Sequence, residues 1–393
     1  MIFRRTIPLV LVAVTACEDP VDLEARAGSF NLPNACGGVT GAPDGRIFTF
    51  SRASSSTVRV DQRTPAGTSI WSVTLPGTAG TSCIGYLDFG GNLVTATTDT
   101  VYSLAAATGA VRWKLPLNQA QLAIGGAEVL AGTRSSNQLG AAVYSIDVNT
   151  GAVKWTRPVP NQSVGVVVDA AQPTVYGIRR HGAAALRPAD GSVIWESTIA
   201  GSRDGNIAAI ASDGSLAVPS NADFTGDIDY YSRDGALKWT SHRSSGIIGP
   251  PVIDQLGTIY AAYPHNVGFT ASVHALSPTD GSTIWSHDFD RIVSDIVVDT
   301  DRTVFVIARS TPDSAFQLYG LRDGNIVSAV AATGVTIGTH TPLLLHYNKL
   351  IYYVAGDRVV FTPTAGISVA APWPMANRDP MRTNRRVPFF PPD

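Results

Sequence analysis

The sequence predicts an all-β protein made of about eight similar units. Six of its seven tryptophans stand four residues after a glycine, and these glycines recur about every 43 residues. The pairs are Gly67 and Trp71, Gly109 and Trp113, Gly151 and Trp155, Gly191 and Trp195, Gly235 and Trp239, and Gly281 and Trp285. Gly324 and Gly366 continue the spacing, with Ser328 and Ala370 in the place of tryptophan.

Within one unit, residues 118–157, apolar stretches and turns predict four short strands. Apolar stretches lie at 122–124, 128–131 and 142–147, and a fourth ends at Trp155. The turn before the last strand ends at Gly151, and glycine there is typical of a hairpin because it accepts a positive φ. Strand alternation puts Val153 and Trp155 on one face and Lys154 on the other. The tryptophan is therefore expected to face protein and to dock one unit onto the next.

A second signature repeats near the start of each unit. Asp-Gly or a similar turn is followed by aliphatic and aromatic residues at Asp44-Gly45, Asp213-Gly214 and Leu256-Gly257. Four-stranded units of about 43 residues without helices are typical of β-propellers, which close into a ring and so avoid open sheet ends. We expect an eight-bladed β-propeller of four-stranded antiparallel blades over residues 34–372. Seven blades are the alternative if a terminal unit is degenerate.

The first residues predict export and a lipid anchor. Residues 1–16 combine Arg4 and Arg5 with a short apolar run and small residues, as in a signal peptide. The ending Val14-Thr15-Ala16-Cys17 resembles the bacterial lipobox, in which the cysteine is lipidated. Ordinary cleavage near Ala16, giving a soluble secreted protein, is the alternative. We expect residues 17–33 to form the lipidated Cys17 and a tether, which places the protein in the bacterial cell envelope, outside the cytoplasm. The outer membrane is favoured and the leaflet stays open.

Composition excludes some partners. Lysine and arginine number 29 against 31 acidic residues, a net charge of −2, which does not favour nucleic-acid binding. Besides Cys17 there are two cysteines, Cys36 and Cys83, each a similar distance before an Asp/Gly turn. We expect them on equivalent inner strands of neighbouring units, where they either form a disulfide or remain two free buried thiols.

The stretch from Ser145 to Trp155 resembles the repeat of the PQQ-like (quinoprotein-type) β-propellers, small-x-Asp-x-x-Thr-Gly-x-x-x-Trp, and the stretch from Ala275 to Trp285 is similar. The resemblance covers roughly residues 40–370. One class of this family comprises PQQ-dependent alcohol and sugar dehydrogenases, whose alcohol-oxidising members hold the quinone against two adjacent disulfide-bonded cysteines, with calcium nearby. The other comprises cofactor-free propellers, including the BamB-like lipoproteins of the outer-membrane β-barrel assembly machinery. Because this chain has no adjacent cysteines, we expect neither PQQ nor calcium.

No signature of a catalytic or zinc site occurs in the sequence. The strongest metal candidate is a weak calcium loop with oxygen side chains at alternate positions, formed by Asn221, Asp223, Thr225, Asp227 and Asp229. Ser232 stands where a bidentate glutamate is needed, so a plain loop is the alternative. Tyr230, Tyr231 and the loop 263–266 are candidate aromatic contacts to a ligand or peptide, or else packing residues. The tail, 373–393, is expected to cap the ring, and its arginines either meet an anionic partner or are solvated.

These observations predict a non-enzymatic, lipid-anchored propeller that acts as a protein-binding scaffold for partners in the cell envelope, in outer-membrane protein assembly in the BamB-like case. A PQQ- and calcium-dependent dehydrogenase and a surface carbohydrate-binding protein are the alternatives. The partner, the face used and the oligomeric state stay open.

Overall fold

The computed structural model describes residues 27–79, 83–133, 141–159, 164–169, 171–179, 182–198, 208–220, 226–243, 246–264, 270–337, 341–346, 349–364 and 385–386. The regular structure of these residues consists of strands, and they contain no α-helix. In this part of the chain there is accordingly no helix with the length and apolar character needed to cross a bilayer.

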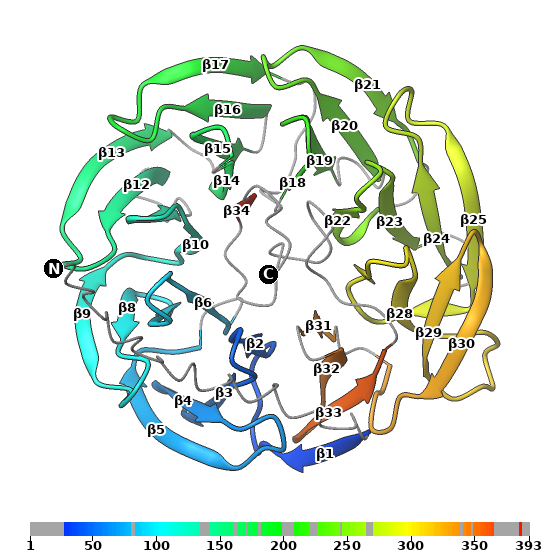
Figure 1. The fold of residues 1–393 in the computed structure, drawn as a ribbon, viewed down its shortest axis with the longest axis horizontal. Helices are drawn as coiled ribbons and strands as arrows, with labels where there is room; N and C mark the ends of the chain where they lie inside the picture. The colour runs from blue at the N-terminus through cyan, green and yellow to red at the C-terminus, as the bar shows by residue number, and fades with distance from the viewer. Residues whose placement is uncertain are drawn as a thin grey trace, which may run out of the picture.

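Eight antiparallel sheets follow one another along the chain and stand around a common axis as the blades of a propeller (Figure 1). Blade 1 comprises β2 (Thr40–Gly41), β3 (Ile47–Ser54), β4 (Thr57–Arg63) and β5 (Ser69–Pro76), and blade 2 comprises β6 (Gly85–Leu87), β7 (Leu93–Ala96), β8 (Thr100–Leu104) and β9 (Val111–Pro116). Blade 3 comprises β10 (Gln121–Ile124), β11 (Glu128–Gly132), β12 (Ala141–Asp147) and β13 (Val153–Val159). Blade 4 comprises β14 (Val164–Asp169), β15 (Thr174–Arg179), β16 (Gly182–Leu186) and β17 (Val193–Thr198).

The second half of the ring repeats the arrangement. Blade 5 comprises β18 (Ala209–Ile210), β19 (Leu216–Ser220), β20 (Asp227–Tyr231) and β21 (Leu237–Ser241), and blade 6 comprises β22 (Ile248–Ile253), β23 (Ile259–Pro264), β24 (Ala271–Leu276) and β25 (Thr283–Phe289). Blade 7 comprises β26 (Arg291–Ile292) and β27 (Val297–Val298), which both pair with β28 (Val304–Arg309), followed by β29 (Gln317–Arg322) and β30 (Asn325–Ala331). Blade 8 comprises β31 (Leu343–Leu345), β32 (Leu350–Ala355), β33 (Arg358–Pro363) and β1 (Gly28–Asn31). Eight blades, not seven, complete the circle, which confirms the predicted fold class.

The ring is closed by a strand from the beginning of the chain. β1 pairs antiparallel with β33, with Gly28 opposite Phe361 and Asn31 opposite Arg358, and so becomes the outer strand of blade 8. Two expectations need correction. The propeller includes residues 28–31, which the sequence analysis assigned to the tether, and the outer strand of blade 8 is β1 rather than a strand around Ala370. Joining the two chain ends in one sheet leaves neither end of the ring open, and this favours the long-range pairing over a local one.

The outer strands depart from strict alternation at one recurring place. A bulge shifts the pairing of the third and fourth strands just after the residue that pairs with the tryptophan. In blade 3, Ser145 pairs with Trp155 but the next residue, Ile146, pairs with Val153. An extra residue in one strand turns its neighbour away from the face that alternation assigns. Val153 is therefore 43% exposed, although alternation placed it beside Trp155, and Val111 and Leu237 are exposed in the same way.

The core consists of apolar layers between neighbouring blades. In blades 4 to 6, buried residues such as Tyr176, Ile228 and Tyr263 form one continuous cluster, and five further clusters lie around the ring. Each blade buries both faces against its neighbours, so strands inside the ring such as β14 and β16 are buried along their whole length. This packing fixes the blades as a rigid frame and leaves turns and outer strands at the surface.

One short strand comes from the C-terminal tail. β34 (Arg385–Arg386) pairs in parallel with β14, with Val168 opposite Arg385. It lies on the inner edge of blade 4, near the axis (Figure 1). The remainder of the predicted cap, 373–384 and 387–393, is outside the described residues.

Candidate interaction surface

Five neighbouring junctions between blades are locked by an indole. Each indole nitrogen donates a hydrogen bond to a backbone carbonyl in the last turn of the following blade. The bonds are Trp71 to Ala106 at 2.9 Å, Trp113 to Val148 at 2.8 Å, Trp155 to Pro188 at 2.6 Å, Trp195 to Arg233 at 2.8 Å and Trp239 to Pro278 at 3.0 Å. Gly151 shows why the turn needs glycine: its φ is +74°, and a Cβ there would lie 2.8 Å from the Trp113 ring.

The other three junctions are built differently. The Trp285 indole donates no hydrogen bond to a described residue, and it packs more loosely over Gly324, where an added Cβ would first meet the Trp285 side chain at 3.3 Å. At the junction between blades 8 and 1, Phe30 of β1 takes the place of the indole. Its ring packs directly over Gly67, where an added Cβ would lie 2.3 Å from it. Blade 7 carries Ser328 at this position and has no ring there.

A buried ion pair joins blades 6 and 7, where the indole bond is missing. The Asp254 carboxylate is fully buried and accepts hydrogen bonds from the Tyr260 hydroxyl at 2.9 Å and from Nε of Arg302 in blade 7 at 3.0 Å. Burial, and then the negative charge of Asp254, raise the pKa of Tyr260. Asp254 and Arg302 are 48 residues apart, so no local pattern in the sequence indicated their contact.

The basic residues just before several tryptophans are paired within their own blades. Lys154 lies 3.3 Å from Glu128, Arg112 lies 3.3 Å from Asp88, and Lys238 lies 3.5 Å from Asp213. Sequence reasoning placed Lys154 away from the tryptophan face but assigned it no partner. Because the lysine and arginine side chains are partly exposed, each pair contributes little stability, and their main effect is to place charge on the outer strands.

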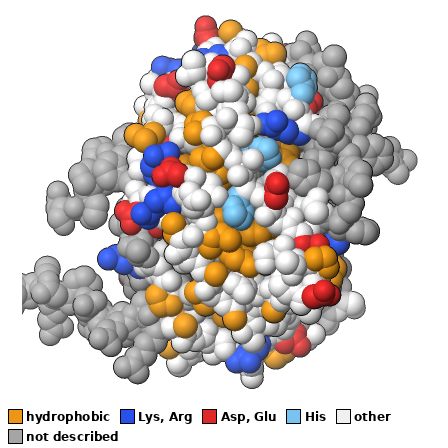
Figure 2. All heavy atoms as spheres, turned by 90° about the vertical axis from the view of Figure 1, so that its right-hand side faces the viewer, with side chains coloured by type: hydrophobic (Ala, Val, Ile, Leu, Met, Phe, Trp, Pro, Cys, Tyr) orange, Lys and Arg blue, Asp and Glu red, His pale blue; other side chains and the backbone are white. Residues whose placement is uncertain are grey.

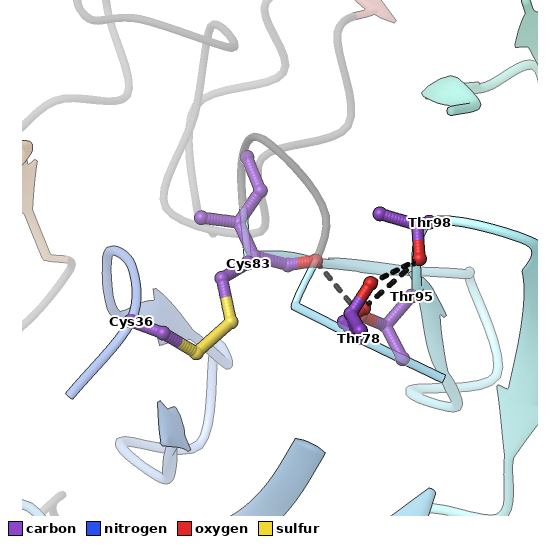
Figure 3. Close-up of a disulfide and its surroundings, with 6 residues drawn as sticks. Cys36, Thr78, Cys83, Thr95 and Thr98 are labelled. Atoms are coloured by element: carbon purple, nitrogen blue, oxygen red, sulfur yellow. Dashed lines mark hydrogen bonds between the residues drawn. A yellow bond between two sulfur atoms is a disulfide. The ribbon is translucent and has the colours of Figure 1, made fainter. Parts of the chain in front are cut away.

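Cys36 and Cys83 form a disulfide, with a Cα–Cα distance of 5.6 Å. Figure 3 shows it between the segments that lead into β2 and β6, the first strands of blades 1 and 2. The Cys36 N–H donates to the Phe50 carbonyl at 3.2 Å, which places this cysteine beside β3. Beside Cys83, Thr95 Oγ1 donates to the Ile84 carbonyl at 2.9 Å. The disulfide therefore ties neighbouring blades together at their inner ends.

The predicted calcium loop lies only partly within the described residues. Asn221, Asp223 and Thr225 lie outside them, whereas Asp227 and Asp229 belong to β20. The Asp229 carboxylate accepts a hydrogen bond from Thr240 Oγ1 at 2.7 Å, and Asp227 lies 3.2 Å from His242 Nδ1. These carboxylates are occupied by protein groups, and the described residues contain no cluster of three or more histidine, cysteine, aspartate or glutamate side chains suited to a metal. The expectation that this loop binds no calcium stays a prediction, because Asn221, Asp223 and Thr225 lie outside the described residues.

The aromatic candidates are packing residues. Tyr230, Tyr231 and Tyr263 are each at most 2% exposed. The Tyr230 ring stacks on Trp239 with 4.9 Å between centroids, and burial raises its pKa to about 12. Tyr263 meets His274 edge to face at 5.2 Å, and burial raises its pKa as well. Of the suggested loop 263–266, residues 265 and 266 lie outside the described part of the chain.

The rim of the ring differs in charge from blade to blade. The outer strands of blades 2 to 6 each contain a titratable side chain: Arg112 and Lys114, Lys154 and Arg157, Glu196, Lys238, and His287 with Asp288. Blades 7, 8 and 1, which are consecutive in the ring, have outer strands without any charge, Asn325–Ala331, Gly28–Asn31 and Ser69–Pro76.

Among these three strands, β30 is the least protected. It is seven residues long, every residue in it is exposed, and it contains neither proline nor charge. Ile326, Val327 and Val330 are 44%, 53% and 42% exposed. Figure 2 shows hydrophobic side chains gathered on the side of the molecule that carries β25 and β30. Natural edge strands are normally kept short or protected by charge or proline, so the outer edge of β30 is the candidate interaction surface.

The predicted anchor is not part of this geometry. Signal peptide and Cys17 lie outside the described residues, so lipidation remains a prediction. The chain enters the described fold at β1, between blades 7 and 1 of the ring.

Comparison with known proteins agrees with this architecture. The family model described as outer membrane protein assembly factor BamB matches residues 54–218. BamB from Moraxella catarrhalis superposes with a TM-score of 0.63 at 17% identity, covering 86% of this chain and 99% of that one. A europium-containing methanol dehydrogenase has a TM-score of 0.63 at 13% identity, covering 84% of each chain. No curated protein matches the sequence.

A propeller from outside this family is equally similar in shape. The C-terminal WD40 domain of Sif2 has a TM-score of 0.65 at 11% identity, covering 86% of this chain and 99% of that domain. At such identities, structural similarity shows the fold alone. The match to the BamB family model adds a similarity in sequence over residues 54–218. This match, together with the tryptophan-locked ring of eight blades, supports the identification of this chain as a PQQ-like β-propeller protein.

Proposed function

We propose that the protein is a non-enzymatic scaffold, anchored by lipid on Cys17 in the bacterial cell envelope, that binds protein partners in outer-membrane protein assembly. The observation that carries the proposal is the uncharged, fully exposed outer strand β30. Resemblance to the BamB family model supports the assembly role, and the lipobox-like ending Val14-Thr15-Ala16-Cys17 supports the anchor.

The mode of binding follows from the backbone of β30. In the described part of the chain it pairs only with β29, so its outer N–H and C=O groups face solvent. An extended segment of a partner can add to such an edge as a further strand, with main-chain hydrogen bonds giving affinity. The exposed Ile326 and Val327 then offer apolar contacts without the cost of burying a charge. A rigid ring presents this edge in one fixed orientation.

The similarity to a methanol dehydrogenase raises the alternative of quinone chemistry. The single disulfide joins cysteines 47 residues apart rather than adjacent ones, and the Asp227 and Asp229 carboxylates are held by protein side chains. These residues do not fit the adjacent-cysteine site of the alcohol enzymes. Addition of PQQ and calcium to the purified protein is expected to produce no alcohol or sugar oxidation.

The scaffold proposal is tested by one charge placed on β30. Ile326→Lys puts an ammonium on the exposed edge, and Val111→Lys is its matched control. Val111 pairs with Leu104 of blade 2 as Ile326 pairs with Leu321, and the two side chains are 46% and 44% exposed. The full chain, expressed in its own host with an affinity tag, is recovered from solubilised envelopes after brief crosslinking, and the co-recovered proteins are quantified by mass spectrometry.

We expect Ile326→Lys to reduce recovery of an outer-membrane assembly partner about tenfold, roughly 1.4 kcal/mol of binding free energy, while Val111→Lys leaves it unchanged. Equal recovery with both variants would contradict the role of β30. A parallel arm with Cys17→Ala tests the anchor, because it should lose incorporation of an alkyne-labelled fatty acid and leave the membrane fraction. Retained labelling in that variant would contradict lipidation at Cys17.

A further inference from the structure

Between blades 7 and 8 lies a cavity of about 300 Å³, open to the surface. Its walls come from β28, β29 and β30 on one side and from the end of β33 on the other, where Thr362, Pro363 and Thr364 line it. In blades 2 to 6, the carbonyl that accepts the indole hydrogen bond lies just after the end of the third strand. The third strand of blade 8 is β33, and its end lines the cavity. The cavity therefore occupies a blade junction of the kind that holds a tryptophan elsewhere.

The missing ring is that of position 328. Ser328 pairs with Gly320 immediately before the bulge, in the register in which Trp113 pairs with Ser103 in blade 2. The turn glycine of this unit is kept, since Gly324 still has a φ of +80°. The backbone thus retains the geometry of a tryptophan-bearing blade, while the side chain that would fill the junction is reduced to a hydroxymethyl group.

The lining of the cavity suits an aromatic guest. Phe305, Leu318 and Val330 form an apolar wall, and the first two are buried. A cavity of about 150 Å³ lined by apolar side chains is enough to bind benzene, so one of about 300 Å³ has room for a bicyclic ring. Small-molecule sites typically combine such apolar walls with a few polar groups that orient the ligand.

Polar groups of this kind line the cavity as well. Asp299 is 1% exposed and accepts hydrogen bonds from the backbone N–H groups of Asp301 at 2.9 Å and Thr303 at 2.8 Å. Burial raises the pKa of Asp299, so its charged form lacks part of its solvation and gains from a further N–H donor. Arg322 donates to Thr303 Oγ1 at 2.7 Å, which brings a guanidinium to the same wall. The Asp299 carboxylate can accept a hydrogen bond from a ring N–H. The Arg322 guanidinium can lie over the face of an aromatic ring in a cation–π contact.

We infer that this cavity is a binding site for an indole ring, a planar bicyclic aromatic group with an N–H donor. The site goes beyond the scaffold function proposed above, and Val327 and Val330 of β30 belong to both surfaces. An external indole would occupy the kind of junction that the protein's own indoles fill between blades 1 and 6, with the Asp299 carboxylate as acceptor in place of a backbone carbonyl. The ring can come from a free heterocycle or from a tryptophan side chain, and the experiment separates the two.

The test uses 5-fluoroindole and the short peptide acetyl-Gly-(5-fluoro-Trp)-Gly-amide as probes, followed by ¹⁹F NMR with the full mature chain. Ser328→Trp should fill the cavity with the protein's own indole, and Ser328→Ala is the matched control that leaves it open. We expect the 5-fluoroindole signal to broaden and shift with the wild type and with Ser328→Ala, and to remain that of free probe with Ser328→Trp. Broadening of the peptide signal as well would assign the site to tryptophan side chains, and its absence would assign it to free heterocycles.

Two results would overturn the inference: no change in either probe signal with the wild-type protein, or equal broadening with a folded Ser328→Trp variant. Circular dichroism and the unfolding midpoint establish that the variant is folded. If it is not, crystals of the wild type soaked with 5-bromoindole decide the matter. An anomalous bromine peak between Phe305 and Pro363 supports the site, and a peak only elsewhere, or none, refutes it.

Discussion

At the scale of single residues, each junction tryptophan combines two contributions to stability. Trp113 is 7% exposed, so its ring buries a large apolar area between blades 2 and 3, and its N–H satisfies the otherwise buried carbonyl of Val148. The hydrogen bond also sets how far the following blade can slide, because the acceptor belongs to a turn whose backbone is fixed by Gly151.

Substitutions of Trp113 separate the two contributions. Trp113→Ala removes ring and hydrogen bond together and is expected to lower the free energy of unfolding by about 4 kcal/mol. Trp113→Phe keeps most of the apolar contact but leaves the Val148 carbonyl without its donor, which should cost about 2 kcal/mol. Urea-induced unfolding, followed by circular dichroism, measures both values.

Trp285→Phe is the control, because the Trp285 indole makes no hydrogen bond to a described residue. Its cost should be clearly smaller than that of Trp113→Phe. If the two phenylalanine variants were equally destabilised, the indole hydrogen bond would not be a source of junction stability.

At the scale of elements, the turns before the outer strands depend on ionised aspartates. Backbone and side-chain hydrogen bonds from Thr150 lower the pKa of Asp147 below its ordinary value of 3.8. The Ser192 hydroxyl and backbone N–H lower that of Asp190, and the same groups of Ser282 lower that of Asp280. Each carboxylate acts as a small cap for its turn, which positions the carbonyl that accepts the preceding blade's indole.

These shifts fix the sign of a pH dependence. Because the folded-state pKa values lie below the ordinary 3.8, the three carboxylates stabilise the fold above that pH, and the contribution disappears as the pH falls through the lowered values. A variant with Asp147→Asn, Asp190→Asn and Asp280→Asn should therefore melt at a lower temperature than the wild type at pH 7. Melting curves between pH 7 and pH 2.5 should converge toward the acid end. A difference that stays constant over this range would show that ionisation of the turns is unimportant.

The elements also show what a sequence can and cannot reveal. The four strands of blade 3 were predictable because apolar stretches alternate with turns, the last of which contains Gly151 and precedes β13. The exposure of Val153 was not, since a bulge depends on how two strands pair. The absence of a ring at Ser328 was visible as a gap in the repeat, but only coordinates show that an open cavity results. The contact of Arg302 with Asp254 joins different blades and has no local signature.

At the scale of the whole molecule, the closure of the ring by β1 was the feature hardest to predict from sequence patterns. β1 lacks the glycine-to-tryptophan spacing found in the outer strands of blades 1 to 6, and its partner β33 lies near the opposite end of the chain. Phe30 nevertheless packs on Gly67 as an indole does elsewhere, and the Arg63 guanidinium lies 5.3 Å from the centre of its ring. Ring closure makes every blade depend on its two neighbours, which is how β30 is held as a rigid edge.

The account depends most on this closure, which hydrogen–deuterium exchange of the segment 28–34 tests directly. The Leu32 N–H donates to the Asp357 carbonyl at 2.7 Å, the Asn34 N–H donates to the Asp357 carboxylate at 2.8 Å, and β1 itself pairs with β33. Mass spectrometry should show these amides exchanging at least about a hundredfold more slowly than an unstructured peptide, and Phe30→Ala should remove much of the protection. Exchange of the wild-type segment at the unstructured rate would contradict a ring closed by the N-terminal strand.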